Sequence, residues 1–186
     1  MIPIQNIYYM LSYAFQILNE QGYRNIATEQ FNNTAELMAA ILEKGIANQL
    51  KRGLGKEYIP QTEALSSLRG KIDIAESIKT QSMLRKQLIC TYDELSVNST
   101  MNQIIKSTVE LLLCSNISKK RKKNLRKLMI YFGEVDFIDL HTVNWNVQYN
   151  RNNQTYRMLI SICYLVVKGL LQTQSDGSKK LMDFLD

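Results

Sequence analysis

The sequence predicts a mainly helical α+β protein with a small antiparallel β element. Several segments place apolar residues at steps of three and four, which is the spacing of amphipathic helices. The stretch 57–74 differs from them, because β-forming residues are combined there with Pro60, a serine pair and Gly70. The last predicted helix, 155–171, is apolar nearly all round, so we expect it to be the central buried element.

Capping residues and glycines set the limits of the predicted helices. Pro3 suits the first turn of the opening helix, and Gly22 ends that helix. Gly53 follows the second helix. The predicted helices span 3–22, 31 or 34 to 50, 101–113, the basic run to 131, and 155–171, and a polar piece over 75–85 is helical or irregular.

The β element is predicted to include a projecting hairpin at about 57–74. Its first strand contains Pro60, and its second is the alternating segment 72–74. A proline has no N–H to donate to a ladder, so the first strand is expected at an edge or as a projecting arm. A further strand is expected over 87–92, which is rich in β-forming residues.

Two cations flank the turn between the predicted hairpin strands. Gly70 allows the backbone a positive φ, and Arg69 and Lys71 on either side of it are left on a poorly covered loop. Exposed cations beside a turn suit a phosphate, a carboxylate or a partner protein. The alternative is a solvated turn with incidental charge, because single surface charges contribute little.

The net charge of +6 comes from one short run. Seven of the nine residues from 119 to 127 are basic, so the run carries +7 and the rest of the chain −1. A local run of this kind suits a nucleic-acid backbone or an acidic partner, and a solvated helix face is the alternative. The candidate nucleic-acid contacts are Lys119, Lys120, Arg121, Lys122, Lys123, Arg126 and Lys127.

Motifs for catalysis and metal binding are absent from the sequence. The segment Gly53–Lys56 is followed by Glu57, whereas a phosphate-binding loop needs serine or threonine after its lysine. His141 is the only histidine, so neither a triad with a second histidine base nor a histidine-rich metal site can form. No acidic residue stands two positions before a lysine, the spacing that a PD-(D/E)xK nuclease needs. We therefore expect no catalytic residue, no metal site and no activity of the chain alone.

The cysteines and the hydropathy indicate the compartment. Cys90, Cys114 and Cys163 are widely spaced in apolar surroundings, which predicts buried reduced thiols rather than disulfides or metal ligands. The apolar stretch 158–171 is too short to span a bilayer. The N-terminus has no cationic region followed by a cleavable apolar segment, so we expect a cytoplasmic protein.

Three segments of the sequence are informative together. They are Ile-Pro-Ile-Gln-Asn-Ile-Tyr-Tyr-Met-Leu-Ser-Tyr-Ala-Phe at 2–15, Arg-Gly-Lys-Ile-Asp at 69–73, and Tyr-Asp-Glu-Leu-Ser-Val-Asn-Ser-Thr-Met-Asn-Gln-Ile-Ile-Lys-Ser-Thr at 92–108. Together these segments resemble the N-terminal half of the McrC family. McrC is the subunit that accompanies the McrB AAA+ GTPase in modification-dependent restriction systems directed at 5-methylcytosine. The resemblance covers nearly the whole chain.

This resemblance implies a function for the whole of 1–186 as a McrC-like N-terminal domain. In the family, this part engages the McrB hexamer and stimulates its GTP hydrolysis, and a C-terminal PD-(D/E)xK nuclease domain follows. Here the sequence stops at Asp186, so we expect a truncated chain or a natural split subunit. GTP and Mg²⁺ are then expected on the partner motor and Mg²⁺ in the missing nuclease domain, with no cofactor in this chain. The expected partner contacts are Arg69, Lys71, Ile72 and Asp73.

The sequence thus leaves two main functions in competition, with an autonomous enzyme as a third and less favoured one. The first is a non-catalytic module that docks on a McrB-type hexamer and couples GTP hydrolysis to DNA cleavage by a separate nuclease domain, with DNA present in the complex. The alternative is a nucleic-acid-binding module that uses the basic run 119–127 together with Arg69 and Lys71.

Overall fold

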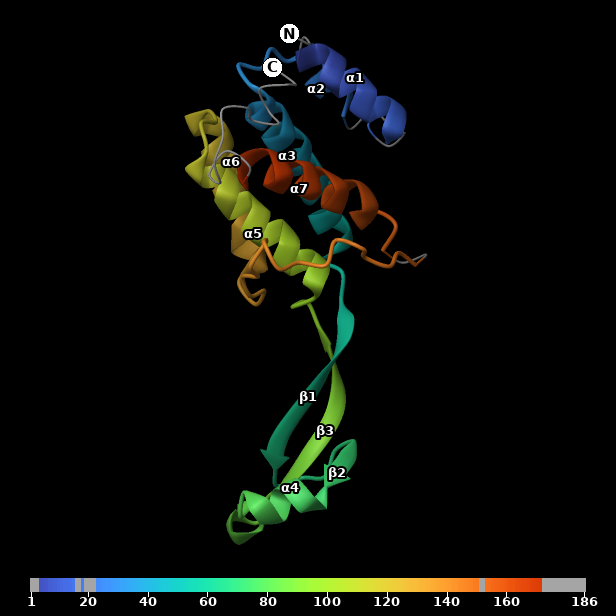
Figure 1. Ribbon diagram of the computed structural model, residues 1–186, viewed down its shortest axis with the longest axis vertical. Coiled ribbons are helices and arrows are strands. Elements are labelled where there is room, and N and C mark those ends of the chain that lie inside the picture. Colours follow the sequence, from blue (N-terminus) through green and yellow to red (C-terminus); the bar gives the residue numbers. More distant parts are fainter. Residues whose placement is uncertain (1–3, 16–17, 19–22, 151–152, 172–186) are drawn as a thin grey trace. The chain divides into compact units, whose positions relative to one another are not determined.

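The computed structural model describes residues 4–15, 18, 23–150 and 153–171 (Figure 1). The chain forms two compact units. The helical unit comprises the described residues up to 54 and from 100 onward, and the sheet unit comprises residues 55–99.

The helical unit is built from helices that the apolar spacing of the sequence predicts. Asn33 caps the third helix by accepting a hydrogen bond from the Glu36 backbone N–H, and Gly53 ends that helix with a φ of 87°. The predicted start at 34 is confirmed, and the helix continues two residues beyond 50. The elements are α1 (Ile4–Ala14), α2 (Arg24–Thr28), α3 (Thr34–Arg52), α5 (Thr100–Cys114), α6 (Lys119–Met129), the 3-10 helix η3 (Ile130–Phe132) and α7 (Tyr156–Leu171).

The opening helix is shorter than predicted. α1 ends at Ala14, whereas the sequence predicts a helix that continues to Gly22. Pro3 and Gly22, its two predicted limits, lie outside the described residues. The Tyr8 hydroxyl, on the buried face of α1, donates to the carbonyls of Leu18 and Tyr23, which fixes α1 against the segment that follows it.

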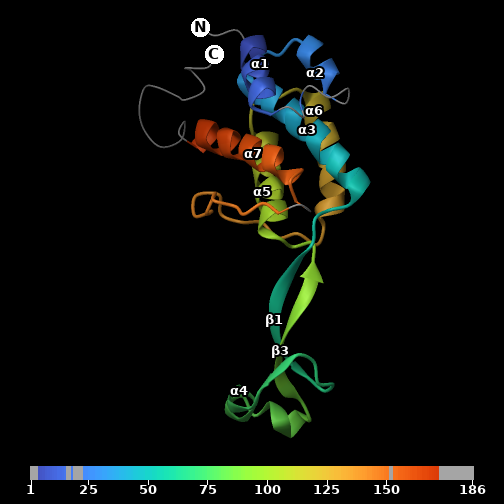
Figure 2. The same ribbon diagram turned by 90° about the vertical axis from the view of Figure 1, so that its right-hand side faces the viewer.

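The core of the helical unit lies where α7 packs against α3 and α5 (Figures 1 and 2). Gly45 of α3 permits a close approach, because a Cβ added to it would lie 2.4 Å from Leu159 Cδ2 of α7. Between α5 and α7, the buried Tyr156 hydroxyl donates to Asn102 Oδ1 over 2.8 Å, so this polar pair is satisfied within the core. The largest fully buried aliphatic side chains of the three helices include Leu37, Met38, Ile41, Leu42, Ile46, Ile104, Ile105 and Leu112.

The prediction that α7 is the central buried helix is confirmed for most of its surface. Its apolar residues are buried over three sides, but Arg157, Tyr164 and Lys168 lie on an exposed strip. The Trp145 and Tyr164 rings meet edge to face at 5.3 Å between centroids, which partly covers that strip. Within the residues that the structure describes, no helix combines the length and the apolar character that crossing a membrane requires.

The sheet unit contains three antiparallel strands and two short helices. In the order β1-β3-β2, β3 lies between the other two strands. The register of β1 on β3 runs from Glu57 opposite Ser96 to Leu65 opposite Leu88. Figure 1 shows α4 beside β2 at one end of this ladder. The elements are β1 (Glu57–Leu65), β2 (Lys71–Asp73), α4 (Ile74–Lys79), the 3-10 helix η2 (Ser82–Arg85) and β3 (Leu88–Ser96).

The hairpin predicted at 57–74 is wrong in its pairing, although both of its strands form. β1 and β2 each pair with β3 and not with one another. The lengths of the strands explain this pairing. All nine residues of β1 pair with the nine residues of β3, whereas β2 is only three residues long. Ile74, expected in the second strand, instead begins α4, because the Asp73 carboxylate accepts a hydrogen bond from the Glu76 backbone N–H and starts a helix. The edge position predicted from Pro60 is confirmed, since β1 is a terminal strand of the sheet.

The three cysteines are free, but only two of them are buried. Cys90 of β3 and Cys163 of α7 are buried as predicted, whereas Cys114 at the end of α5 is exposed, contrary to the prediction. Burial raises the pKa of the Cys163 thiol to about 12. The three thiols therefore differ in reactivity.

We expect a thiol reagent at pH 8 to modify the folded chain once, at Cys114. Cys163 stays protonated at this pH because its pKa is about 12, and the side chains of both Cys90 and Cys163 are inaccessible. Intact mass after brief maleimide treatment measures the number of adducts. Denatured chain, as the control, should carry three adducts, and more than one adduct on the folded chain would contradict the burial of Cys90 and Cys163.

Candidate partner-docking tip and basic helix

The turn at Gly70 is held against the central strand of the sheet unit. Gly70 has a φ of 67°, so the positive φ predicted from the sequence is confirmed. A Cβ at this position would lie 2.3 Å from the Thr91 carbonyl oxygen and 2.7 Å from Tyr92 Cβ. Both the conformation and the space require glycine, so the chain on either side of Gly70 is fixed on the β3 backbone.

Arg69 lies on an aromatic face next to this turn. Its guanidinium carbon is 4.1 Å from the centroid of the Tyr92 ring. The Tyr92 hydroxyl donates to the Glu63 carboxylate on β1, and this hydrogen bond is the main cause of the raised Tyr92 pKa. Glu63, Tyr92 and Arg69 thus form a row in which a strand-to-strand hydrogen bond orients the ring and the ring orients the cation.

The other predicted contact residues have separate roles in the sheet unit. Lys71 is exposed, and its backbone pairs opposite Thr91. Ile72 is half-buried and pairs opposite Cys90. The Asp73 carboxylate caps α4, so it positions the helix that follows the turn. With Arg69 these three residues lie in one segment of the sequence, 69–73, and their contact with a partner stays a prediction.

Sequence analysis missed a set of exposed apolar side chains in the segment that contains this turn and the two short helices after it. Six large hydrophobic side chains of the sheet unit are between 52% and 81% exposed; five of them lie within residues 68–84, and the sixth is Tyr58 of β1. Ile74 and Ile78 are four residues apart on α4, a helical spacing that the assignment of Ile74 to a strand concealed. We call this group, together with Arg69 and Lys71, the docking tip. Its apolar members are Leu68, Ile74, Ile78, Met83 and Leu84.

The basic run forms α6, as predicted, and one of its cations faces inward. The Arg121 guanidinium lies 2.8 Å from Glu29, 2.8 Å from Glu43 and 3.4 Å from Glu36, with its side chain only 16% exposed. Burial alone would lower the pKa of Arg121, but hydrogen bonds to Glu43 and Glu29 and the charges of these two residues raise it. Arg121 is therefore occupied by carboxylates and holds the helix in place.

Glu36 also anchors the start of α6. Its carboxylate accepts hydrogen bonds from the Ser118 backbone N–H over 2.6 Å and from the Ser118 hydroxyl over 2.8 Å. Ser118 in turn caps α6 by accepting from the Arg121 backbone N–H. Asn124 donates to Glu43 over 2.9 Å one turn further along. We call Glu29, Glu36, Glu43 and Arg121 the carboxylate clamp. Nucleic-acid binding by the other six cations stays a prediction.

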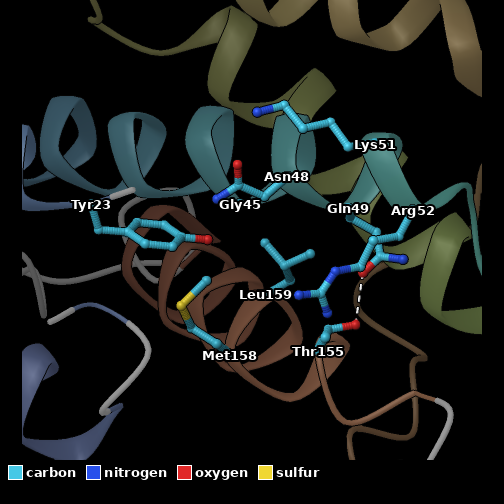
Figure 3. A pocket seen from close by; sticks show the side chains of 9 residues that line it. All are labelled: Tyr23, Gly45, Asn48, Gln49, Lys51, Arg52, Thr155, Met158 and Leu159. Carbon is cyan, nitrogen blue, oxygen red and sulfur yellow. Dashed lines mark hydrogen bonds between the residues drawn. The ribbon is translucent and has the colours of Figure 1, made fainter. Parts of the chain in front are cut away.

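A pocket of about 210 Å³ opens between α3 and α7 (Figure 3). On its rim, the Thr155 hydroxyl donates to Gln49 Oε1 over 2.7 Å, and Gln49 donates to the Gly53 carbonyl over 2.9 Å. Gln49 thus links Thr155 to the backbone at the end of α3. Within the described ranges, no group of three or more His, Cys, Asp or Glu side chains is placed to hold a metal ion. The pocket is lined by Tyr23, Gly45, Asn48, Gln49, Lys51, Arg52, Thr155, Met158 and Leu159.

The fold is that of a two-unit α+β protein. The family described as "McrBC 5-methylcytosine restriction system component" matches residues 5–185. The chain belongs to this family. Both the fold class and the resemblance seen in the sequence are thereby confirmed.

Individual relatives agree with the family assignment. The chain is 30% identical over 191 residues to the "Type IV methyl-directed restriction enzyme EcoKMcrBC" of Escherichia coli strain K12, with 98% of this chain covered. It spans about half the length of that relative, 53%. Among solved structures, the Thermococcus gammatolerans McrBC complex matches with a TM-score of 0.66 at 21% identity, covering 91% of this chain and 55% of the matched chain. A half-complex of McrB AAA+ hexamers with bound McrC from the same organism matches with a TM-score of 0.63 at 21% identity, covering 82% and 39%.

We expect Arg121→Ala to lower the free energy of unfolding by about 2–3 kcal/mol, since removing one partner from a largely buried ion cluster leaves the other charges unpaired. Partial exposure of the glutamates keeps the loss below that of a fully buried pair. Urea denaturation measures it. Arg126→Ala on the exposed side of the same helix is the matched control and should change the free energy by less than about 0.5 kcal/mol. Equal losses in the two variants would show that the carboxylate clamp is not stabilising.

Proposed function

We propose that this chain is the N-terminal module of a McrC-like restriction subunit. It docks on a McrB-type AAA+ GTPase hexamer, stimulates GTP hydrolysis and couples this hydrolysis to DNA cleavage by a separate nuclease domain. The observation that carries the proposal is the docking tip, in which an oriented arginine lies in the same small unit as exposed apolar side chains. A neighbour with the same fold is described as McrC bound to McrB AAA+ hexamers, which supports this assignment of partner.

The apolar residues of the tip serve docking. Isolated exposed apolar residues are common on proteins, but several large ones in a unit of 45 residues favour a protein interface. Leu84 is the most exposed of them, at 81%. Ile74 and Ile78 add a short apolar strip on α4, which suits a groove on a partner.

The arginine of the tip serves stimulation. Hydrolysis by a P-loop motor accelerates when a partner orders the catalytic loops or supplies a cation near the transferred phosphoryl group. Arg69 is suited to either task, because the Tyr92 ring and the fixed Gly70 turn restrict its position before docking. Less ordering is then required when the hexamer binds.

The chain is proposed to have no catalytic role of its own and to act in the cytoplasm. GTP and Mg²⁺ belong to the motor in this scheme, and Mg²⁺ for cleavage belongs to the nuclease domain. The sequence supports this division, since no acidic residue stands two positions before a lysine.

Arg69→Ala should retain binding to a cognate McrB-type hexamer and stimulate its GTPase at least about tenfold less, which corresponds to about 1.4 kcal/mol of transition-state stabilisation. The fold should persist because Gly70 and the strand pairing are unchanged. Steady-state GTP hydrolysis at saturating chain, together with a binding isotherm, separates stimulation from docking. Arg85→Ala, an exposed arginine of the same unit, is the matched control and should stimulate normally. Full stimulation by the Arg69→Ala chain would remove this residue from the mechanism.

Leu84→Asp should weaken binding to the same hexamer at least about tenfold, because a carboxylate cannot enter the apolar contact proposed for the tip without desolvation. Its melting temperature should stay within about 2 °C of the unmodified chain, since the side chain is already in solvent. Fluorescence anisotropy of labelled chain measures the affinity. Ile130→Asp changes an equally apolar side chain, 76% exposed, on the helical unit and should leave the affinity unchanged. Equal weakening by both variants would place the contact elsewhere.

A further inference from the structure

The cations of α6 other than Arg121 lie on one side of the helix. At 100° per residue, they fall within an arc of about 160°, and Asn124, Leu125 and Arg121 fall on the opposite side. The structure agrees with this division, because Leu125 is fully buried and Arg121 is held by the carboxylate clamp. Five of the six are exposed and Lys122 is half-buried. We call these six residues the cationic arc: Lys119, Lys120, Lys122, Lys123, Arg126 and Lys127.

The cationic arc opposes the stability of its own helix. The N-terminus of a helix carries a partial positive charge and favours acidic side chains, yet the first turn of α6 holds no acidic residue and begins with consecutive cations. Lys119 and Lys123, and Lys123 and Lys127, are like charges four residues apart, which repel each other. The carboxylate of Glu36 on α3 partly offsets this by anchoring Ser118. A local rule broken in this way is typical of a functional surface.

The chemistry of the arc distinguishes its ligand. A protein interface is generally centred on buried aromatic or aliphatic anchors, and the arc contains none. From Lys119 to Lys127 the helix rises about 12 Å, and duplex DNA presents about seven phosphate charges over the same length. The exposed Ile130 and Tyr131 lie beyond the end of α6, on η3. A continuous cationic face without anchors matches a regular row of phosphates.

We propose that the cationic arc binds the phosphodiester backbone of double-stranded DNA without reading its sequence. Lysine and arginine contacts to phosphate position a protein on a duplex and carry no base information. The three carboxylates nearest to α6 do not cancel the arc, because they are engaged by Arg121, Asn124 and Ser118 on its inner side. This proposal rests on the helical unit alone, so it stands or falls independently of docking by the tip.

The test is binding of the unmodified chain to a labelled 25-base-pair duplex between 50 and 200 mM salt. Three to six phosphate contacts give a slope of log affinity against log salt of about −3 to −5, which is a loss of about 60- to 1,000-fold over this range. Lys119→Glu, Lys123→Glu and Arg126→Glu combined should reduce that slope by about three and leave the melting temperature within about 2 °C. A second duplex of unrelated sequence should bind equally well.

A control variant with the same net charge separates the arc from general attraction. Lys51→Glu, Lys56→Glu and Lys79→Glu combined change three exposed lysines outside α6 and should leave the slope within about one unit of the original. Equal loss of slope in the two triple variants would overturn the proposal, because any surface cation would then serve. An affinity that does not vary with salt, or a preference for single-stranded DNA, would also overturn the proposal. So would an absence of binding at 50 mM salt, which would favour an acidic protein as the partner of the arc.

Discussion

The position of α6 depends on the carboxylate of Glu36. This one group accepts two hydrogen bonds from Ser118, 82 residues away along the chain, and takes part in the clamp around Arg121. The first turn of α6 lacks acidic residues, so the negative charge that favours a helix N-terminus is supplied from α3 instead. Leu125 of the same helix is fully buried. A helix as cationic as α6 can therefore be kept in a fixed place with its charges directed to solvent.

The sheet unit depends in a comparable way on its central strand. β3 provides the partner for both other strands, and its Thr91 and Tyr92 lie directly against Gly70. Tyr92 then extends this support to a side chain, since its ring carries Arg69 and its hydroxyl is bonded to Glu63 of β1. The geometry of the Arg69 turn is thus set by residues more than twenty positions later in the sequence. Gly70 allows the positive φ of this turn, and contact with β3 fixes the turn in that conformation.

Features that depend on neighbouring residues, such as helices and their caps, are predicted from the sequence. Features that depend on residues far along the chain, such as strand pairing, are not. Apolar spacing and the caps at Asn33 and Gly53 are short-range signals, so α3, α5, α6 and α7 are predicted closely. The pairing of β1 with β3 is long-range, and a nearby strand such as β2 competes with β3 equally well on local grounds. The exposure of Cys114 follows from its place at the end of α5, which apolar neighbours in the sequence do not indicate.

For the basic helix α6, the positions of the residues around the helix axis indicate which cations face inward, and the sequence of charges alone does not. Arg121, Leu125 and Leu128 recur at steps of four and three, and this spacing by itself indicates that Arg121 shares the inner face of α6 with the two leucines. The same spacing joins Ile74 to Ile78, but it becomes meaningful only when Ile74 is assigned to a helix. The carboxylates that hold Arg121 cannot be chosen from sequence, because no local rule pairs residues on separate elements.

The two proposed surfaces differ in the force that each would use, and this difference has a consequence for the assembled system. Contacts made by the cationic arc depend on released counterions and weaken steeply as salt rises. Apolar contacts of the docking tip depend on removing surface from water, and salt does not screen them. Since the surfaces belong to separate compact units, each can act on its own ligand. If both surfaces act as proposed, the chain would hold its protein partner at salt concentrations at which it releases and rebinds DNA. This behaviour would suit a module that stays on a motor while the nucleic acid changes position.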